Sequence, residues 1–343
     1  MTGVIVAPFG GTPSEWDELA RRSDGFSHFH LYAWKGILER TFGHECPYLG
    51  ARDETGRLTG LLPLVRVRSL LFGHYLVSMP FLNYGGPLGE PGAVQALTAA
   101  AAARARSEQV KLLELRSRIP LAVDLPVSHR KITVVLDLAP SADAAWKALP
   151  SKLRSQVKKP EKEGVTFRLD REQLEPFYAV FARHMRDLGT PTLPLRFFRE
   201  IARAFPDDAW FGCAWYRGRP VACGAGFRFG REFEMTWASA LSEYNRIAPN
   251  MGLYWAFMQR AIAEGAAEFN FGRCSPDSGT HRFKRQWGSR DVPLYWYQQS
   301  KDGGAAATPS PDQGAWSMGP RVWKRLPLPL ANLLGPRIVR GIP

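Results

Sequence analysis

Cations and large aromatic side chains are interleaved in the stretch Glu268–Gly288, which carries the strongest chemical signal of the sequence. The stretch opens with a short aromatic strand that ends at Gly272 and Arg273, and a turn then leads to a segment that holds Lys284 and Trp287. A fully solvated loop has no need for buried-type aromatic rings, so we expect this segment to dock on a core and to aim its cations at an anionic or polarised substrate. The alternative is a helix whose cations face solvent.

A carboxylate lies within the predicted strand Glu232–Ala238. Glu232 and Glu234 share one face of this strand. The other face is expected to hold Phe233, Met235 and Trp237. A carboxylate inside a covered sheet is costly unless it is paired or takes part in chemistry. Glu234 lies nearer the middle and is the candidate for receiving a proton, and an ion pair with a neighbouring arginine is the alternative.

A helix is expected to begin near Asn250, after the strand and the loop Ser239–Pro249. The free N–H groups and the dipole of such a helix start attract a phosphate or a carboxylate. Asn250 could equally serve only as the N-cap of this helix.

The elements that would position these groups occur twice along the chain. The first half has the predicted strands Pro47–Arg52 and Leu58–Arg68, then a third strand, a loop, a helix and a strand that ends at Arg116. The second half repeats this order and ends at Arg273. We interpret the repetition as a duplicated αβ unit, although any mixed αβ chain can be aligned in this way.

Length and composition bound the protein class. A chain of 343 residues fits two domains, and its net charge of +13 favours anionic partners such as nucleic acid, phosphorylated precursors or an anionic membrane face. The cysteines are scattered without a CxxC pair, so neither a metal site nor a disulfide framework is expected, and a reducing cytoplasm fits. They are Cys46, Cys213, Cys223 and Cys274. The first residues predict no signal peptide, and no stretch has the roughly 20 apolar residues of a spanning helix.

The composition changes after Gln299. Residues 301–314 are rich in Gly, Ala, Pro and Ser, which is typical of a flexible linker. Residues 316–343 combine tryptophans and aliphatic residues with basic but no acidic residues, and prolines are expected to prevent a long helix. This tail suits the surface of an anionic membrane. The alternative is a tail that packs back on the fold.

Several short motifs together resemble those of a known family. They are Gly218-Arg219, Asn250, Phe269–Arg273, and Phe283-Lys284 followed by Trp287-Gly288. The chain resembles the FemAB-like proteins, relatives of the GNAT N-acyltransferases, and most of all the FemAB-related group associated with exosortase (PEP-CTERM) and exopolysaccharide loci. The resemblance covers about residues 25–300, and its most specific parts are Ser78–Pro87 and Gly279–Gly288. It implies an α+β fold of two tandem GNAT-like domains, 1–140 and 141–300, each a mixed sheet flanked by helices, followed by 301–343.

The resemblance also implies a cytoplasmic enzyme that transfers an acyl or aminoacyl group to an amine of a cell-envelope or exopolysaccharide precursor. The segment Arg246–Gly252 stands where GNAT enzymes carry the loop that cradles coenzyme A pyrophosphate. The co-substrate therefore stays open between acyl-CoA and aminoacyl-tRNA, with no permanently bound cofactor and no metal. On this view tRNA is a donor only, the acceptor is an anionic precursor, and DNA is not a partner.

On this interpretation we assign roles to the candidate residues. Lys284 would stabilise a tetrahedral oxyanion, and Glu234 would accept the proton of the attacking amine. The substrate-binding set is expected to comprise Arg273, Asn250, Gly252, Arg116 and Trp287. A binding module that holds an anionic polysaccharide or lipid-linked precursor without chemistry is the alternative. A nucleic-acid-binding protein is disfavoured, because the basic residues are spread along the chain and no RRM, KH or helix-turn-helix pattern is present.

Overall fold

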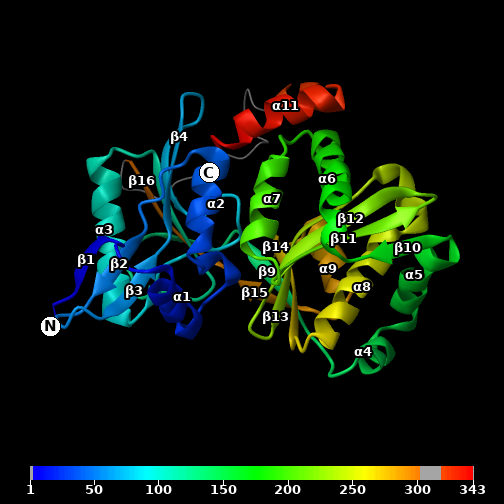
Figure 1. The fold of residues 1–343 in the computed structure, drawn as a ribbon, viewed down its shortest axis with the longest axis horizontal. Helices are drawn as coiled ribbons and strands as arrows, with labels where there is room; N and C mark the ends of the chain where they lie inside the picture. The colour runs from blue at the N-terminus through cyan, green and yellow to red at the C-terminus, as the bar shows by residue number, and fades with distance from the viewer. Residues whose placement is uncertain (1–2, 302–317, 343) are drawn as a thin grey trace. The chain divides into compact units, whose positions relative to one another are not determined.

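The computed structural model describes residues 3–301 and 318–342, and the chain divides into two compact units (Figure 1). Each unit is built from mixed α and β structure, with helices packed on sheets, as expected.

The unit boundaries differ from the expected 1–140 and 141–300 by one strand each. Unit 1 runs to Lys131, and the chain returns to it at Pro293. The strand β16 (Tyr295–Ser300) therefore belongs to unit 1. Unit 2 begins at Ile132, and its first strand, β9 (Ile132–Asp137), pairs with a strand of the same unit far along the sequence. Pairing between remote strands sets these boundaries, and composition gives no sign of it.

Unit 1 contains a four-stranded sheet in the order β1-β2-β3-β6 and a five-stranded sheet in the order β4-β5-β7-β16-β8. The strands are β1 (Ile5–Pro8), β2 (Leu49–Arg52), β3 (Leu58–Leu62), β4 (Leu64–Ser69), β5 (Gly73–Ser78), β6 (Leu88–Gly89), β7 (Leu112–Ser117), β8 (Val127–Ser128) and β16. The single strand expected over Leu58–Arg68 is divided at Pro63, which has no N–H to donate to a ladder. Its two parts therefore enter different sheets.

The helices of unit 1 are α1 (Pro13–Arg22), α2 (Ala33–Phe42) and α3 (Pro91–Ser107) in the described part of the chain. Thr12 caps α1 by accepting a hydrogen bond from the Glu15 N–H, and Gly43 ends α2 in a left-handed conformation. The alanine-rich α3 packs Leu97 and Ala101 into a core with the sheet residues. The small side chains let the helix approach the strands closely.

Unit 2 is organised around a seven-stranded sheet in the order β10-β11-β12-β13-β14-β9-β15. Its strands are β10 (Val165–Arg168), β11 (Ala209–Tyr216), β12 (Arg219–Phe229), β13 (Glu232–Ala240), β14 (Glu268–Cys274), β9 and β15 (Arg290–Pro293). The neighbours β13 and β14 run parallel, whereas β11–β12, β12–β13 and β14–β9 are antiparallel.

Helices flank this sheet (Figure 1). In the described residues they are α4 (Ala142–Ala148), α5 (Ser151–Lys162), α6 (Leu174–Leu188), α7 (Leu195–Ala204), α8 (Pro249–Ala263), α9 (Gly279–Arg285), α10 (Met318–Trp323) and α11 (Leu328–Val339). Both α6 and α8 pack on β12, and α5 packs on α8. The core under α8 includes Phe233, Phe257 and Phe269, so this helix is anchored by aromatic packing.

The predicted duplication is confirmed in element order and strand direction. Unit 1 has antiparallel strands, then β5, α3 and β7, with β7 parallel to β5. Unit 2 has antiparallel strands, then β13, α8 and β14, with β14 parallel to β13. The strand before the helix and the strand after it are thus parallel neighbours in both units, as a helical crossover requires.

The tail packs on unit 2 through α10 and α11, which both contact α6. Ala331 and Gly335 of α11 are buried, and a Cβ on Gly335 would stand 3.0 Å from the Thr192 nitrogen. Pro336 lies inside α11 and does not end it. The expected linker from residue 302 onward and Trp316 lie outside the described residues. Among the described helices, none has both the length and the apolar character needed to cross a bilayer.

Candidate active site

The parallel ladder between β13 and β14 ends in the middle of the sheet. Its register joins Glu232 to Glu268 and Phe233 to Phe269, and Glu234 to Asn270 is the last pair. Both strands continue beyond that pair, β13 to Ala240 and β14 to Cys274. The two strands therefore part after Glu234, and the gap between parallel strand ends is where ligands of αβ sheets collect.

A bulge in β13 accompanies this separation. The register with β12 shifts so that Met235 lies opposite Gly226 and Trp237 lies opposite Ala225. A Cβ on Gly226 would stand 2.0 Å from the Glu234 carbonyl oxygen, so only glycine fits against the bulged strand. The expectation that Phe233, Met235 and Trp237 share a face was wrong for Trp237, because the extra residue Thr236 reverses the alternation. Phe233 and Met235 join the core under α8, whereas Trp237 contacts Phe197, Phe198 and Phe227.

Asn270 ties three strands together at the last ladder pair. Its Oδ1 accepts hydrogen bonds from the Thr133 hydroxyl of β9 at 2.6 Å and from the Gly272 N–H at 2.8 Å. Its Nδ2 donates to Glu232 at 2.8 Å. Asn270, Thr133 and Glu234 are all buried. A buried amide held by three hydrogen bonds fixes the geometry around it, so Asn270 helps to set where the two strands separate.

Gly272 turns the end of β14 toward Lys284. Its φ of 74° lies in the left-handed region, and the ladder with β9 is irregular between Asn270 and Arg273. The Lys284 ammonium donates to the Gly272 carbonyl oxygen at 2.7 Å and to the Arg273 carbonyl oxygen at 3.0 Å. Lys284 is 4% exposed and therefore does not face bulk solvent, which excludes the alternative of a surface charge.

Lys284 is electrostatically coupled to the other candidate residues. Burial lowers the pKa of Lys284 from its ordinary value to about 8, because the charged form loses its hydration. The Cys274 sulfur and the Glu234 carboxylate act in the opposite direction, and the positive charge of Arg273 adds to the lowering. The structure thus brings Lys284, Glu234 and Arg273 into one electrostatic environment, which spacing in the sequence could only suggest.

Aromatic packing holds α9 against α8. The Phe283 and Trp287 rings lie 5.1 Å and 6.4 Å from the Tyr254 ring of α8, and Gln286 contacts Met251 in the first turn of α8. The helix ends at Arg285, so Trp287 lies in the following turn and not on the same helix face as Phe283. Trp287 is 2% exposed, and the structure gives it an anchoring position in the core and no surface for a substrate.

The segment that leads into α8 is largely exposed. Ala248 is the N-cap, with φ of 51° and no side-chain cap, and Asn250 is the second residue of the helix. The Asn250 Oδ1 atom is buried and has no hydrogen-bond partner among the described residues, and Arg246 before the helix is exposed. Gly252 has a packing role instead, since a Cβ there would stand 2.1 Å from the Phe167 ring of β10.

Lys284, Glu234, Arg273, Asn270 and Thr133 are together called the Lys284 cluster. Arg116 lies in unit 1 and is not part of this cluster. It is 3% exposed, and its guanidinium donates to Glu114 at 2.7 Å and to the Leu82 carbonyl oxygen at 3.1 Å. The same group stacks on the Trp296 ring at 4.6 Å. These contacts satisfy a buried charge, so the structure gives Arg116 a structural role where substrate binding was expected.

In unit 1, the loop that follows β5 folds back onto β7. The N–H groups of Gly85 and Gly86 donate to the Arg116 carbonyl oxygen at 2.9 and 2.7 Å, and Met79, Leu82 and Tyr84 are fully buried. In unit 2, the corresponding segment, 242–246, is largely exposed. The chain itself thus fills the space beside β7 in unit 1, which favours unit 2 as the site of any donor.

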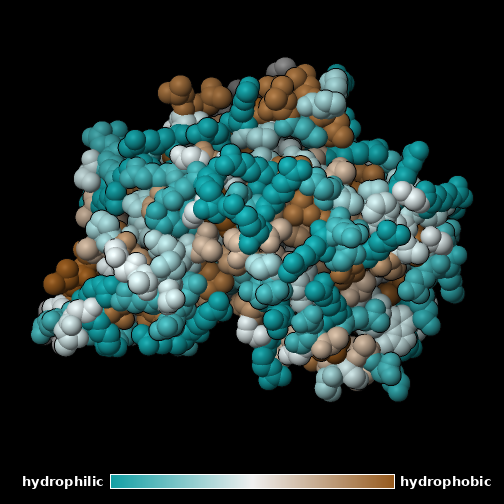
Figure 2. Space-filling view, viewed as in Figure 1, coloured by the Kyte–Doolittle hydropathy of each residue, from teal (hydrophilic) through white to brown (hydrophobic). Residues whose placement is uncertain are grey.

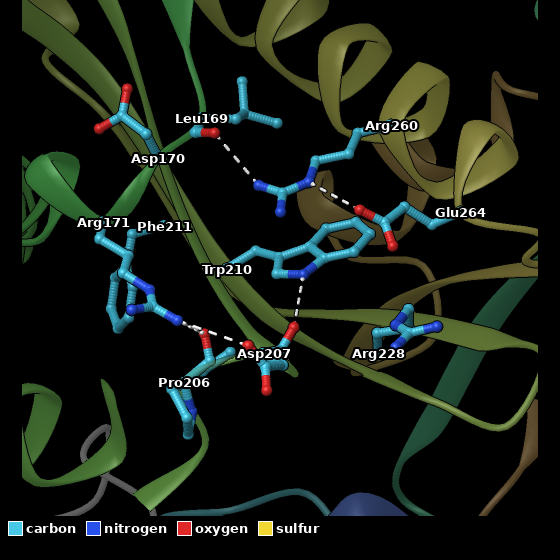
Figure 3. A pocket seen from close by; sticks show the side chains of 11 residues that line it. Leu169, Asp170, Arg171, Pro206, Asp207, Trp210, Phe211, Arg228, Arg260 and Glu264 are labelled. Atoms are coloured by element: carbon cyan, nitrogen blue, oxygen red, sulfur yellow. Dashed lines mark hydrogen bonds and ion pairs between the residues drawn. The ribbon is translucent and has the colours of Figure 1, made fainter. Parts of the chain in front are cut away.

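A separate pocket of about 410 Å³ lies at the C-terminal end of α8 (Figure 3). Arg260 stacks on Trp210 at 4.2 Å and reaches Glu264 at 3.7 Å, and Arg171 reaches Asp207 at 3.4 Å. Arg171 and Arg260 of this pocket are therefore paired with carboxylates that also line it. Because Asn250 lies at the other end of α8, this pocket is distinct from the Lys284 cluster.

The family model described as an acetyltransferase (GNAT) domain matches residues 147–285, from the end of α4 to Lys284 and Arg285. Residues 147–285 thus match a GNAT acetyltransferase domain. This GNAT domain contains the parted strands, the start of α8 and the buried lysine. The match supports an acyltransferase, and domains of this kind use acyl-CoA as co-substrate. In the described part of the chain, no group of three potential ligand side chains could hold a metal ion.

Solved structures share this fold over most of the chain. The crystal structure of FemX is 14% identical, with a TM-score of 0.64 over 84% of this chain and 96% of that chain. L-PGS from Bacillus licheniformis is 13% identical, with a TM-score of 0.55 over 96% and 97%. A tandem GNAT protein from the clavulanic acid biosynthesis pathway is 13% identical, with a TM-score of 0.51 over 89% and 100%. No curated protein sequence matches significantly. The predicted tandem GNAT fold is confirmed.

Two further residues of the cluster were not among the predicted site residues. Asn270 appears within the motif Phe269–Arg273, and a polar residue centred in an aromatic strand was the available signal. Thr133 gave no signal, because its strand comes from a remote part of the chain and pairs with β14 only in the folded protein.

Proposed function

We propose that the protein is an N-acyl- or aminoacyltransferase whose acceptor is an amine of a cell-envelope or exopolysaccharide precursor. The observation that carries the proposal is the buried Lys284, coupled to Glu234 at the point where β13 and β14 part. The class of acceptor rests on the resemblance to the FemAB-related proteins of exosortase and exopolysaccharide loci.

The donor would bind with its phosphates at the start of α8. The uncapped N-terminus provides N–H groups and the positive end of the helix dipole, and the exposed Arg246 adds a positive charge. The acyl carbonyl would then enter the gap between the parted strands. Either acyl-CoA or aminoacyl-tRNA presents a phosphate and an activated carbonyl, and the GNAT domain match favours acyl-CoA.

In the reaction, the lone pair of the acceptor nitrogen attacks the carbonyl carbon, and the carbonyl oxygen becomes an oxyanion. Two N–H groups of the Lys284 ammonium donate hydrogen bonds to the carbonyl oxygens of Gly272 and Arg273. The third N–H group would donate to the oxyanion. Glu234 takes the proton released by the amine, directly or through water. Collapse of the intermediate forms the amide and expels either the thiolate or the tRNA hydroxyl, whose oxygen takes the proton held by Glu234.

Native mass spectrometry of the purified protein against acyl-CoAs and aminoacyl-tRNA tests the proposal. We expect a donor complex that the Arg246→Gln substitution weakens, followed by mass transfer to an added amine. Binding of an anionic polysaccharide or lipid-linked precursor, with no donor complex and no transfer, would contradict the enzyme and favour a binding module.

A further inference from the structure

One face of α11 is apolar, basic and exposed. Ala331 and Gly335 bury the packed face of the helix. Leu330, Leu333 and Arg337 are spaced three and four residues apart, so they share a face turned away from the packed side. The exposed fractions of Leu330 and Leu333 are 40% and 58%. Figure 2 shows apolar side chains gathered over α11. A helix on the surface of a globular protein normally has polar residues on the face that points away from the core.

The charged side chains of residues 318–342 have a single sign. Arg321, Lys324, Arg325 and Arg337 are all exposed, and Val322 of α10 is 60% exposed. No aspartate or glutamate occurs in residues 318–342. Exposed aliphatic side chains next to cations, with no anions, are the pattern of a segment that lies in the interface of an anionic bilayer.

We propose that α10 and α11 bind the surface of an anionic lipid bilayer. Leu330, Leu333 and Val322 enter the boundary between headgroups and acyl chains, and the cations contact lipid phosphates. The helix lies in the plane of the membrane, because α11 has 12 residues and a spanning helix needs about 20. Because Gly335 of α11 packs closely against Thr192, binding of α11 to a membrane also holds unit 2 at the membrane surface. The inference does not depend on transferase activity.

A second copy of the chain fits this face less well than a membrane does. A two-fold contact would place the same patch on both sides and would set the cations of one copy against those of the other. Like charges brought together across an interface oppose association. An anionic membrane meets both the aliphatic side chains and the cations.

The test is flotation of the full-length protein with phosphatidylcholine vesicles that contain, or lack, phosphatidylglycerol. We expect binding to the anionic vesicles only, weakened by added salt. The Leu330→Gln/Leu333→Gln variant should bind roughly tenfold more weakly, since two aliphatic side chains leave the interface. Neutralising Arg321, Lys324 and Arg325 with glutamine should cost on the order of fivefold per cation.

The matched control is Ile5→Gln, which removes another exposed aliphatic side chain from the edge strand β1 and should leave binding unchanged. Thermal denaturation of each variant checks that the fold persists. Equal binding of the wild type and the leucine variant overturns the proposal, and so does equal binding to neutral vesicles. Self-association that the leucine variant abolishes, without vesicle binding, overturns it in favour of a second copy.

Discussion

The Lys284 ammonium donates a hydrogen bond of 2.7 Å to the carbonyl oxygen of Gly272, a glycine held in the left-handed conformation. This bond joins the end of the strand β14 to the helix α9. It holds a buried cation close enough to Glu234 for the two charges to interact. The contact gives the GNAT domain a positive group beside the gap between its parted strands.

Replacing Lys284 with methionine should lower kcat by roughly 10²–10³, the usual scale for losing one oxyanion donor. Methionine keeps the length of the aliphatic stem, so the fold should survive. Steady-state kinetics with the donor identified by mass spectrometry would measure the loss. Arg285→Met, one residue along on the exposed side of α9, is the control and should keep its activity. Unchanged turnover in Lys284→Met would remove Lys284 from the mechanism.

The pKa of about 8 for Lys284 predicts a pH dependence of the rate. The protonated ammonium is the form that stabilises an oxyanion, and it is lost as the pH rises through about 8. We therefore expect kcat to fall above this pH in the wild type, and the same fall to be missing in the residual activity of Lys284→Met. A pH profile with the same alkaline limb in both proteins would assign that limb to another group.

Lys284 should also make stability depend on pH. Its folded-state pKa is about 8 and its ordinary value is 10.5, so between these values the unfolded chain binds more protons than the folded chain. The free energy of unfolding should therefore rise with pH across this window. Urea denaturation of the wild type and of Lys284→Met at both ends of the window measures the difference. If the free energy of unfolding of Lys284→Met rises with pH as much as that of the wild type, the prediction is contradicted.

Asn270→Asp should destabilise the junction of β13, β14 and β9. Aspartate keeps an oxygen for Thr133 and Gly272 but replaces the amide donor to Glu232 with a second carboxylate. The expected loss is about 2–4 kcal/mol near neutral pH, and protonation of one carboxyl at acidic pH should recover part of it. Chemical denaturation across pH tests this. A loss that does not change with pH would mean that carboxylate repulsion is not its cause.

Gly226→Ala should lower stability by about 1–3 kcal/mol or more, because its Cβ would stand 2.0 Å from the Glu234 carbonyl oxygen and force the bulge of β13 to move. Gly92→Ala is the control, since a Cβ there meets nothing within 4 Å. The two melting temperatures, compared with the wild type, give the result. Equal stability of both variants would show that the bulge tolerates a side chain.

The sequence by itself determined the repeated order of strands and helix and the segment that carries the cations. Those features depend on local patterns: alternating aromatic residues in Phe269–Phe271, a helix start near Asn250, and a turn that leads to Lys284. Local patterns are read within a few residues, so they predict elements and the residue types at their ends.

Tertiary structure decided the functional details. The bulge at Thr236 moved Trp237 to the other face, and the pairing of β9 with β14 brought Thr133 to Asn270. Burial, together with the nearby positive charge of Arg273, then lowered the pKa of Lys284. Strand pairing and desolvation depend on residues far apart in the chain, and their free energies exist only once those residues pack together.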